Sequence, residues 1–281
     1  MAYLEDTIKA LRDYFSTRPD VLMAFVFGSF ARGNETAESD LDIAVYIAPE
    51  GPEIEWEETR DYEIEDEIWR SVEKIVGRDT DLIVLNRAPS TLACSIVQEG
   101  IPVIVKDPAL YLRFSLLVST AAEDFREWSR DFRAIKQRSM SLTDVDRDRL
   151  TRIVDFLETE LADHSKFAGI DERTYRTDAD ARRNVERWAE NLVNASIDIA
   201  KIILASEKAR MPQTYRETIE ALALLPGFNP QTAETLARFS KLRNILAHEY
   251  VDIRFKRIRQ FVSEAGPLYR ELLDLARRFL G

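Results

Sequence analysis

The sequence lacks the features that mark secreted and membrane proteins. It has a single cysteine, Cys94, so no disulfide can form within the chain. No apolar run follows a basic N-terminal segment, and no stretch approaches the roughly 20 apolar residues that span a bilayer. We therefore expect a cytoplasmic protein with no membrane partner.

Positive charge is scarce, but only in one half of the chain. The 281 residues have a net charge of −11, which argues against a general nucleic-acid-binding protein and against DNA as a partner. Residues 1–135 contain 14 Lys and Arg against 27 Asp and Glu, whereas residues 136–281 contain 25 against 23. A contact with RNA therefore remains open only for the second half.

The first half alternates helical and strand patterns, which indicates a domain that combines helices with a small sheet. Short apolar runs predict four strands, at 21–27, 42–47, 81–85 and 101–105. Helical patterns accompany them at 3–15, 55–76, 89–98 and 108–132, and the one at 55–76 is very acidic. We place this first domain at residues 1–135.

The second half shows no strand pattern. Its amphipathic segments predict a bundle of four or five helices, at 144–167, 178–206, 214–224, 230–249 and 253–279. We place this all-α domain at residues 140–281, so the fold class of the whole chain is α+β.

A Gly-Ser turn and nearby aspartates form the first group with recognisable chemistry. Gly28 allows a tight turn after a buried strand, and Ser29 supplies a hydroxyl and a backbone N–H suited to a triphosphate. Asp40 and Asp42 are two apart on the next strand, so they point to the same side of the sheet and suit Mg²⁺. A third carboxylate is expected from the neighbouring strand, where Asp81 is preferred.

Two positions compete for that third carboxylate. Asp81 is the last polar residue before the apolar run 82–85, and Asp79 has the same parity along the strand. We favour Asp81 because it adjoins the apolar run.

The spacing Gly-Ser-x-Ala-x-Gly, then Ser-Asp-x-Asp, resembles the minimal nucleotidyltransferase (MNT) branch of the DNA polymerase beta-like superfamily. This resemblance implies a small mixed sheet with helices, and transfer of AMP from ATP with release of pyrophosphate. It implies that Gly28 and Ser29 bind the triphosphate. Asp40 and Asp42 then bind Mg²⁺. Asp81 completes the metal site and, as a catalytic residue, helps to remove the proton from the attacking hydroxyl.

The second group is the segment 243–250, which gathers Arg243, His248 and Tyr250 in a chain with only two histidines. An isolated histidine on a helix is more often structural. On a helical wheel Arg243 and His248 diverge by roughly 140°. Two side chains on such different faces of one helix can contact the same phosphate if they come from the two chains of a symmetric dimer. They can also do so near a helix end, where the backbone departs from regular helical geometry. The segment therefore favours a homodimer.

The pattern Arg-x4-His-x-Tyr in an all-α bundle resembles the HEPN superfamily, in particular the HepT-like branch found beside MNT proteins in toxin-antitoxin pairs. This resemblance implies a metal-independent endoribonuclease, dimeric through the HEPN domain, with Arg243 and His248 catalytic at the scissile phosphate of RNA. It also implies that the MNT domain adenylylates Tyr250. AMP on that phenol would block RNA by bulk and negative charge.

One position departs from the HepT-like pattern. Asn194 stands where this branch often has an acidic residue, one turn before Asp198. If that acid supports cleavage, Glu190 or Asp198 has to replace it.

Three functions follow from these observations. The leading hypothesis is a fused toxin-antitoxin protein that silences its own ribonuclease by modifying Tyr250. The second is a nucleotidyltransferase acting on a small molecule such as an aminoglycoside, with the helical domain for substrate binding and dimerisation. The acidic segment 55–73 would suit such a polycation, although a solvated helix face is the commoner role of a charge run. The third is a helical half that only dimerises or binds a nucleotide.

Overall fold

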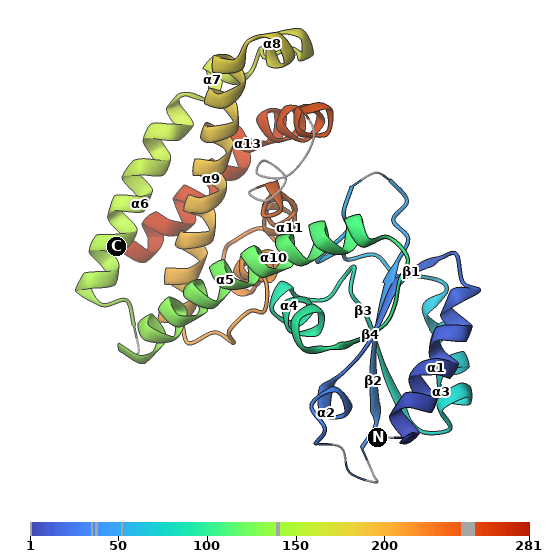
Figure 1. The fold of residues 1–281 in the computed structure, drawn as a ribbon. Coiled ribbons are helices and arrows are strands. Elements are labelled where there is room, and N and C mark those ends of the chain that lie inside the picture. The colour runs from blue at the N-terminus through green and yellow to red at the C-terminus, as the bar shows by residue number, and fades with distance from the viewer. Residues whose placement is uncertain (1, 35, 37–38, 52, 139–140, 243–250) are drawn as a thin grey trace. The chain divides into compact units, whose positions relative to one another are not determined.

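The computed structural model describes residues 2–34, 36, 39–51, 53–138, 141–242 and 251–281, which Figure 1 shows as a ribbon. The chain divides into two compact units, Met1–Arg126 and Glu127–Gly281. The division falls within the long helix α5 (Pro108–Arg138). Each unit contains buried apolar residues that form a core of its own.

A four-stranded sheet with the order β3-β2-β1-β4 forms the centre of the first unit. Its strands are β1 (Val21–Phe27), β2 (Leu41–Ile47), β3 (Thr80–Val84) and β4 (Ile101–Val105). β1 pairs antiparallel with β2 and β4, whereas β2 pairs parallel with β3. The predicted strands and the mixed sheet are confirmed, and β2 and β3 each begin one residue earlier than expected.

Helices cover both faces of this sheet, because successive residues of a strand point to opposite sides. Met23 and Phe25 of β1 pack in one apolar cluster with α4 (Ser90–Glu99) and the first part of α5. Ala24 and Val26 pack in the other cluster, with α1 (Ala2–Ser16) and α3 (Glu65–Val76). Full burial of a large apolar side chain stabilises the fold by about 1.5–3 kcal/mol, so the two clusters hold the strand register from both sides.

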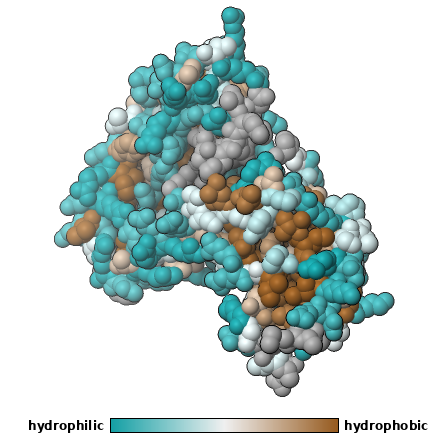
Figure 2. Space-filling model, in the orientation of Figure 1, coloured by the Kyte–Doolittle hydropathy of each residue, from teal (hydrophilic) through white to brown (hydrophobic). Residues whose placement is uncertain are grey.

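Some apolar surface remains outside these clusters. Hydrophilic residues cover most of the face seen in Figure 2, and hydrophobic residues gather over part of the first unit. The most exposed large apolar residues described in that unit are Leu112 and Leu116, which are 67% and 64% exposed and one turn apart on α5.

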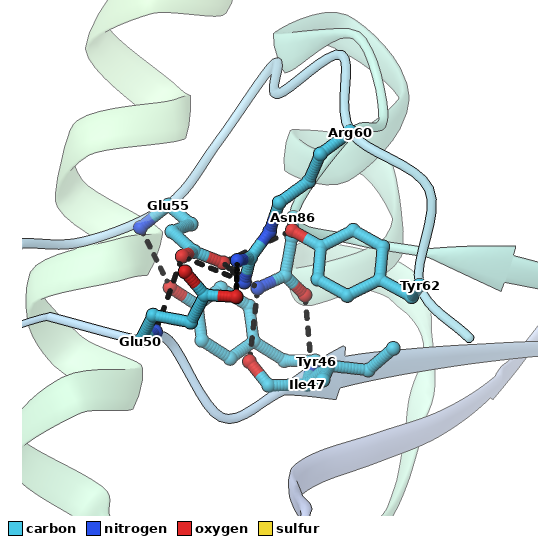
Figure 3. A network of polar contacts seen from close by, with 7 residues as sticks. All are labelled: Tyr46, Ile47, Glu50, Glu55, Arg60, Tyr62 and Asn86. Carbon is cyan, nitrogen blue, oxygen red and sulfur yellow. Dashed lines mark hydrogen bonds and ion pairs between the residues drawn. The ribbon is translucent and has the colours of Figure 1, made fainter. Parts of the chain in front are cut away.

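The helix predicted over 55–76 is wrong in its first half, because α3 begins only at Glu65. Figure 3 shows what replaces the missing turns. The Glu55 side chain, only 14% exposed, accepts hydrogen bonds from Tyr62 Oη (3.0 Å), Arg60 Nη2 (2.9 Å) and Asn86 Nδ2 (3.0 Å). A largely buried carboxylate is stable only with such donors. Asn86 lies far along the chain, so a long-range network prevails over the local helical pattern.

Asn86 and Tyr46 attach this network to the end of β2. Asn86 Nδ2 donates to the Ile47 carbonyl (2.9 Å), and Asn86 Oδ1 accepts from the Ile47 N–H (2.8 Å). The Glu55 N–H donates to Tyr46 Oη (2.9 Å). The segment before α3 is thereby held against the sheet, and this fixes where α3 begins.

The described part of the second unit contains helices and no strands, as predicted. These are α6 (Asp144–Ala162), α7 (His164–Phe167), α8 (Glu172–Thr177), α9 (Ala179–Ser206), α10 (Tyr215–Glu220), the 3-10 helix η1 (Ala221–Leu224), α11 (Pro230–Phe239) and α13 (Val251–Leu280). α9 is central, because most of its second half is buried and both α6 and α13 pack against it (Figure 1). No helix in the described ranges is both long and apolar enough to cross a membrane.

Five helices of this unit begin at polar residues that cap their first turns. The side chain of each capping residue accepts a hydrogen bond from a backbone N–H of the helix that follows. Such caps stabilise a helix by about 1 kcal/mol each. They are Thr143 before α6, Asp171 before α8, Asp178 before α9, Thr214 before α10 and Asn229 before α11.

Candidate active sites

The Gly-Ser turn meets strand β2 at a close contact between Gly28 and Asp42. β1 runs directly into the short helix α2 (Gly28–Ala31), and Gly28 makes the turn with a left-handed φ of +69°. A Cβ added to Gly28 would lie 1.9 Å from Oδ2 of Asp42 and 2.7 Å from its Cγ. Only glycine satisfies both the backbone angle and the contact. The turn therefore places main chain directly against a carboxylate.

Asp42 is partly buried and has other charged groups around it. Burial raises the pKa of Asp42, and the negative charge of Asp81 raises it further. The Ser29 backbone N–H lowers it by donating a hydrogen bond, Asp40 raises it, and Arg32 lowers it. The net result is a pKa above the ordinary value. A bound cation would relieve this repulsion, so the local charges suit a metal ion.

The strand register makes Asp81, rather than Asp79, the neighbour of Asp42. Asp42 and Asp81 are partners across the parallel strands β2 and β3. Asp79 precedes β3, and its carbonyl accepts a hydrogen bond from the Leu41 N–H (3.0 Å). Asp40 precedes β2 at the same end of the sheet. Among the described residues, no group of three or more His, Cys, Asp or Glu side chains is arranged to hold a metal ion. Metal binding by the three aspartates stays a prediction.

Arg78 belongs to this site although no sequence motif indicated it. Its Nη1 donates a hydrogen bond to the Ser39 carbonyl (3.0 Å), and its guanidinium carbon lies 5.0 Å from the centre of the Phe30 ring. Phe30 follows Ser29, and Ser39 precedes Asp40. Arg78 therefore connects the two halves of the motif.

A cavity of about 240 Å³ opens beside Asp81. Its lining comes from β3 and α3, and consists of Thr80, Asp81, Leu82, Glu65, Asp66 and Trp69. The Trp69 indole N–H donates to the Thr80 carbonyl (2.7 Å), while the side chain stays 40% exposed. Carboxylates beside an accessible aromatic ring favour a cationic group. Asp66 and Glu67 remain exposed, as expected for a solvated helix face, and Glu65 and Asp66 also line the cavity.

The HepT-like motif lies outside the described residues. Arg243, Asn244, His248 and Tyr250 all fall within 243–250, so their roles stay predictions. The described chain resumes at Val251, where α13 begins.

A buried cluster anchors the first turns of α13. Arg254 forms an ion pair with Glu186 of α9, with 3.4 Å between Nη1 and Oε1. Tyr175 of α8 is fully buried and donates a hydrogen bond to the same carboxylate. Burial, together with Glu186, raises the pKa of Tyr175, so the phenol keeps its proton and remains a donor. These contacts fix α13 four residues after Tyr250.

The departure from the HepT-like pattern lies on α9. Asn194 is half-buried there. Glu190 forms an ion pair with Arg187 (3.0 Å), and Asp198 forms one with Lys201 (2.8 Å). Glu190 and Asp198, the two candidates for the missing acid, are thus each paired with a basic residue of the same helix. Either one would have to support RNA cleavage while it forms this ion pair.

The first unit has a mixed sheet in which a glycine turn contacts a strand aspartate, as in a nucleotidyltransferase fold. A helical bundle follows it, so this fold is joined to an all-α domain. Residues 9–109 match the family "Polymerase beta, Nucleotidyltransferase", and residues 157–275 match the family "Ribonuclease HepT-like". The chain is therefore an enzyme that contains a polymerase-beta nucleotidyltransferase domain and a HepT-like ribonuclease domain. Both family resemblances seen in the sequence are confirmed.

Several solved toxin-antitoxin structures are similar to part of this chain. A toxin-antitoxin with AMP-PNP is 24% identical with a TM-score of 0.34, and the match covers 44% of this chain and 89% of the other. The toxin-antitoxin MntA-HepT is 21% identical with a TM-score of 0.32, over 45% and 89%. The tri-AMPylated Shewanella oneidensis HEPN toxin in complex with MNT antitoxin is 18% identical with a TM-score of 0.33, over 44% and 90%. A search of curated proteins found no match.

Proposed function

We propose that this chain is a fused toxin-antitoxin protein. Its nucleotidyltransferase domain transfers AMP from ATP to Tyr250 and thereby inhibits the endoribonuclease activity of the HepT-like domain. The observation that carries the proposal is the packing of Gly28 against Asp42, next to Asp81, in a chain that also contains the 243–250 motif. One polypeptide then supplies a triphosphate turn, the carboxylates and a tyrosine acceptor.

In the proposed transfer, the phenol oxygen of Tyr250 attacks the α-phosphorus of ATP. A bond forms between that oxygen and phosphorus, and the bond from phosphorus to pyrophosphate breaks. Gly28 lets the main chain approach the triphosphate, and the Ser29 hydroxyl donates a hydrogen bond to it. Asp81 accepts the phenol proton. The products are AMP-tyrosine and pyrophosphate.

Mg²⁺ is the metal that fits this site in the proposal. Asp40, Asp42 and Asp81 offer the carboxylate oxygens that Mg²⁺ prefers, and their mutual repulsion disfavours leaving them without a cation. When bound, Mg²⁺ would stabilise negative charge on the attacking and leaving oxygens.

Modification of Tyr250 would inhibit the ribonuclease through charge and bulk. Arg243 is proposed to stabilise negative charge on the scissile phosphate of RNA, and His248 to transfer a proton there. Both lie within seven residues of Tyr250. AMP adds a phosphate and a nucleoside at that place, so it competes with RNA for the same groups. The proposed assembly is a homodimer through the helical domain.

The first test is the intact mass of the full chain after incubation with ATP and Mg²⁺. Protein that starts unmodified is expected to gain mass in whole AMP units, and both Asp42→Asn and Tyr250→Phe are expected to abolish the gain. A gain that persists in Tyr250→Phe moves the acceptor elsewhere. No gain in the unaltered chain overturns self-modification.

The second test concerns the ribonuclease. The Asp42→Asn protein, which cannot modify itself, is expected to cleave single-stranded RNA in the presence of EDTA. His248→Ala in the same background is expected to remove that cleavage. Equal cleavage with and without His248 would assign the activity to a contaminant and leave the helical domain as a dimerisation or nucleotide-binding module.

A second candidate function is supported by the cavity beside Asp81. Glu65, Asp66 and Trp69 line it, and these side chains favour a cationic acceptor such as an aminoglycoside. In that case an amino sugar incubated with ATP, Mg²⁺ and the Tyr250→Phe protein would gain the mass of AMP. An unchanged amino sugar would remove this candidate.

A further inference from the structure

A second and larger cavity lies in the helical unit. It has a volume of about 580 Å³ and lies between the segment 164–172 and the first half of α13, which contributes Arg259, Val262 and Ser263. Figure 1 shows α7 and α8 beside this half of α13. The Tyr175 and Phe255 rings pack with their centres 5.2 Å apart, and this contact joins α8 to α13. The cavity is therefore framed by the tertiary packing of three helices.

His164 forms one wall of this cavity, and a hydrogen bond determines which of its ring nitrogens is the donor. Its Nε2 lies 2.8 Å from the Val262 carbonyl, and because a carbonyl only accepts, Nε2 is the donor. In the neutral ring Nδ1 is then left as an acceptor. Gly266 makes room for the ring, because a Cβ there would lie 3.3 Å from Cε1 of His164. The imidazole is thus held in place with one nitrogen still able to accept from a ligand.

The charged side chains in the cavity lining are two carboxylates, Asp171 and Glu172, and one guanidinium, Arg259. Glu172 accepts two hydrogen bonds from Arg176, at 2.9 and 2.8 Å. Asp171 caps α8 by accepting from the Thr174 N–H (2.7 Å). Arg259, by contrast, is exposed and forms no ion pair with any described residue. A guanidinium that is not already paired binds phosphate readily, often through two parallel hydrogen bonds.

Arg259 also lies on the helix that directly follows the HepT-like motif. α13 begins at Val251, so Arg259 is about 12 Å along it at 1.5 Å per residue. Lys256 is exposed between the two points, and Lys256, Arg259 and Ser263 fall within about 60° of one another on the helical wheel. This polar face runs along the first turns of α13 to the cavity.

We propose that this cavity is a subsite for a nucleotide of single-stranded RNA flanking the cleaved bond. Arg259 binds its phosphate. His164 Nδ1 and Ser263 Oγ accept hydrogen bonds from its sugar or base, since the Ser263 hydroxyl already donates to the Gln260 carbonyl (2.7 Å). The subsite rests on the proposed ribonuclease function, since it gives the HepT-like domain a contact outside the 243–250 motif. The apolar parts of the lining, Ala168, Ile170 and Val262, provide the surface that a base covers.

The test measures RNA affinity by fluorescence anisotropy. The parent is the full chain carrying Asp42→Asn and His248→Ala, which neither modifies itself nor cuts RNA, and the probe is a fluorescein-labelled single-stranded RNA of mixed sequence. Arg259→Ala and Ser263→Leu are compared with the parent over a range of salt concentrations. Arg259 and Ser263 are exposed, so neither change removes a core contact. Arg277→Ala on the same helix is the matched control, because its guanidinium already pairs with Glu158 and Asp274.

Arg259→Ala is expected to weaken binding about five-fold and to reduce the slope of log affinity against log salt by about 0.7, as for loss of one phosphate contact. Ser263→Leu, which fills the cavity, is expected to weaken binding with an unchanged slope. Parental affinity and slope in Arg259→Ala would overturn the subsite while leaving AMP transfer and RNA cleavage untouched. A parent that binds no RNA would overturn the subsite and the ribonuclease together, and AMP transfer to Tyr250 would still be judged by mass.

Discussion

Asp81 is the register partner of Asp42 across the parallel strands β2 and β3, and its negative charge helps to raise the pKa of Asp42. Asp79, two residues earlier, lies before the strand, and its carbonyl accepts a hydrogen bond from the Leu41 N–H of β2. Asp79 and Asp81 are two residues apart, so the sequence pattern places them on the same side of a strand, but only Asp81 lies within β3. They therefore form a matched pair for testing which carboxylate serves the transfer reaction.

Asp81→Asn is expected to lower the rate of AMP transfer by a factor of about 10²–10⁴, the usual loss when a proton acceptor is removed. Asp79→Asn is expected to stay within about twofold of the parent, since exposed polar substitutions have small effects. Single-turnover transfer from radiolabelled ATP measures both. Equal losses in the two variants would mean that general negative charge, and not the register partner, supports the reaction.

Gly28→Ala is expected to abolish transfer and to destabilise the chain more than Gly33→Ala does. Both glycines have left-handed φ angles, +69° and +66°, so both alanines pay about 1–2 kcal/mol in backbone strain. An added Cβ at Gly33 meets nothing within 4 Å, whereas one at Gly28 overlaps the Asp42 carboxylate. Urea unfolding separates the two contributions. Matching unfolding midpoints would show that Asp42 moves aside at no cost.

Arg78→Leu is expected to slow self-modification at low ATP about 10- to 100-fold, because loss of one charged hydrogen bond is worth about 1.5–3 kcal/mol. The reason is that Arg78 holds the Ser39 carbonyl and the Phe30 ring on either side of the motif. Arg70→Leu is the control, since the Arg70 side chain is 75% exposed on α3 and its ion pair with Asp66 is long, at 3.9 Å. Single-turnover rates of self-modification at several ATP concentrations would contradict this role if the two variants behaved alike.

The stability of the helical unit is expected to depend on the ionisation of Asp131. Burial alone would raise the pKa of Asp131, but hydrogen bonds and charge from Lys201 and Arg149 hold it below its ordinary value. A carboxylate whose pKa is lowered by folding stabilises the folded protein above about pH 4, the ordinary pKa of aspartate. This contribution is lost as the pH falls through the pKa that the carboxylate has in the folded protein.

Asp131→Asn should therefore destabilise by about 1–3 kcal/mol at pH 7, and the difference from the parent should shrink below about pH 4. Lys201 is 5% exposed and keeps Asp198 as its remaining partner. Asp274→Asn, at an exposed ion pair with Arg277, should change stability by less than about 1 kcal/mol at any pH. Urea titrations at several pH values measure this. A difference that stays constant down to pH 2 would assign the effect to packing.

The sequence predicts the parts of this site that depend on local pattern, and misses Arg78, which acts through tertiary contacts. The turn at Gly28 and the common side of Asp40 and Asp42 follow from residue type and strand periodicity. The preference for Asp81 over Asp79 also comes from local pattern, the apolar run that follows it, and the pairing of β3 with β2 places Asp81 beside Asp42. Arg78 was missed because a single arginine in a turn has no periodicity and no motif.

The error at residues 55–64 has a similar cause. The acidic segment has a helical pattern, but Glu55 is held by Asn86, which lies beyond β3 in the sequence. Local propensity is a weak guide wherever a buried polar group finds its partners far along the chain. The 243–250 motif was recognised by residue type alone, and its geometry lies outside the described residues.

The contact between Gly28 and Asp42 also restricts how this site can change by mutation. A larger residue at 28 requires a shorter one at 42, and no residue shorter than aspartate has a carboxylate. Lengthening position 42 to glutamate would press an additional methylene toward the main chain of Gly28. A library randomised at both positions and selected for AMP transfer should therefore return only the native pair, with no compensated double mutant.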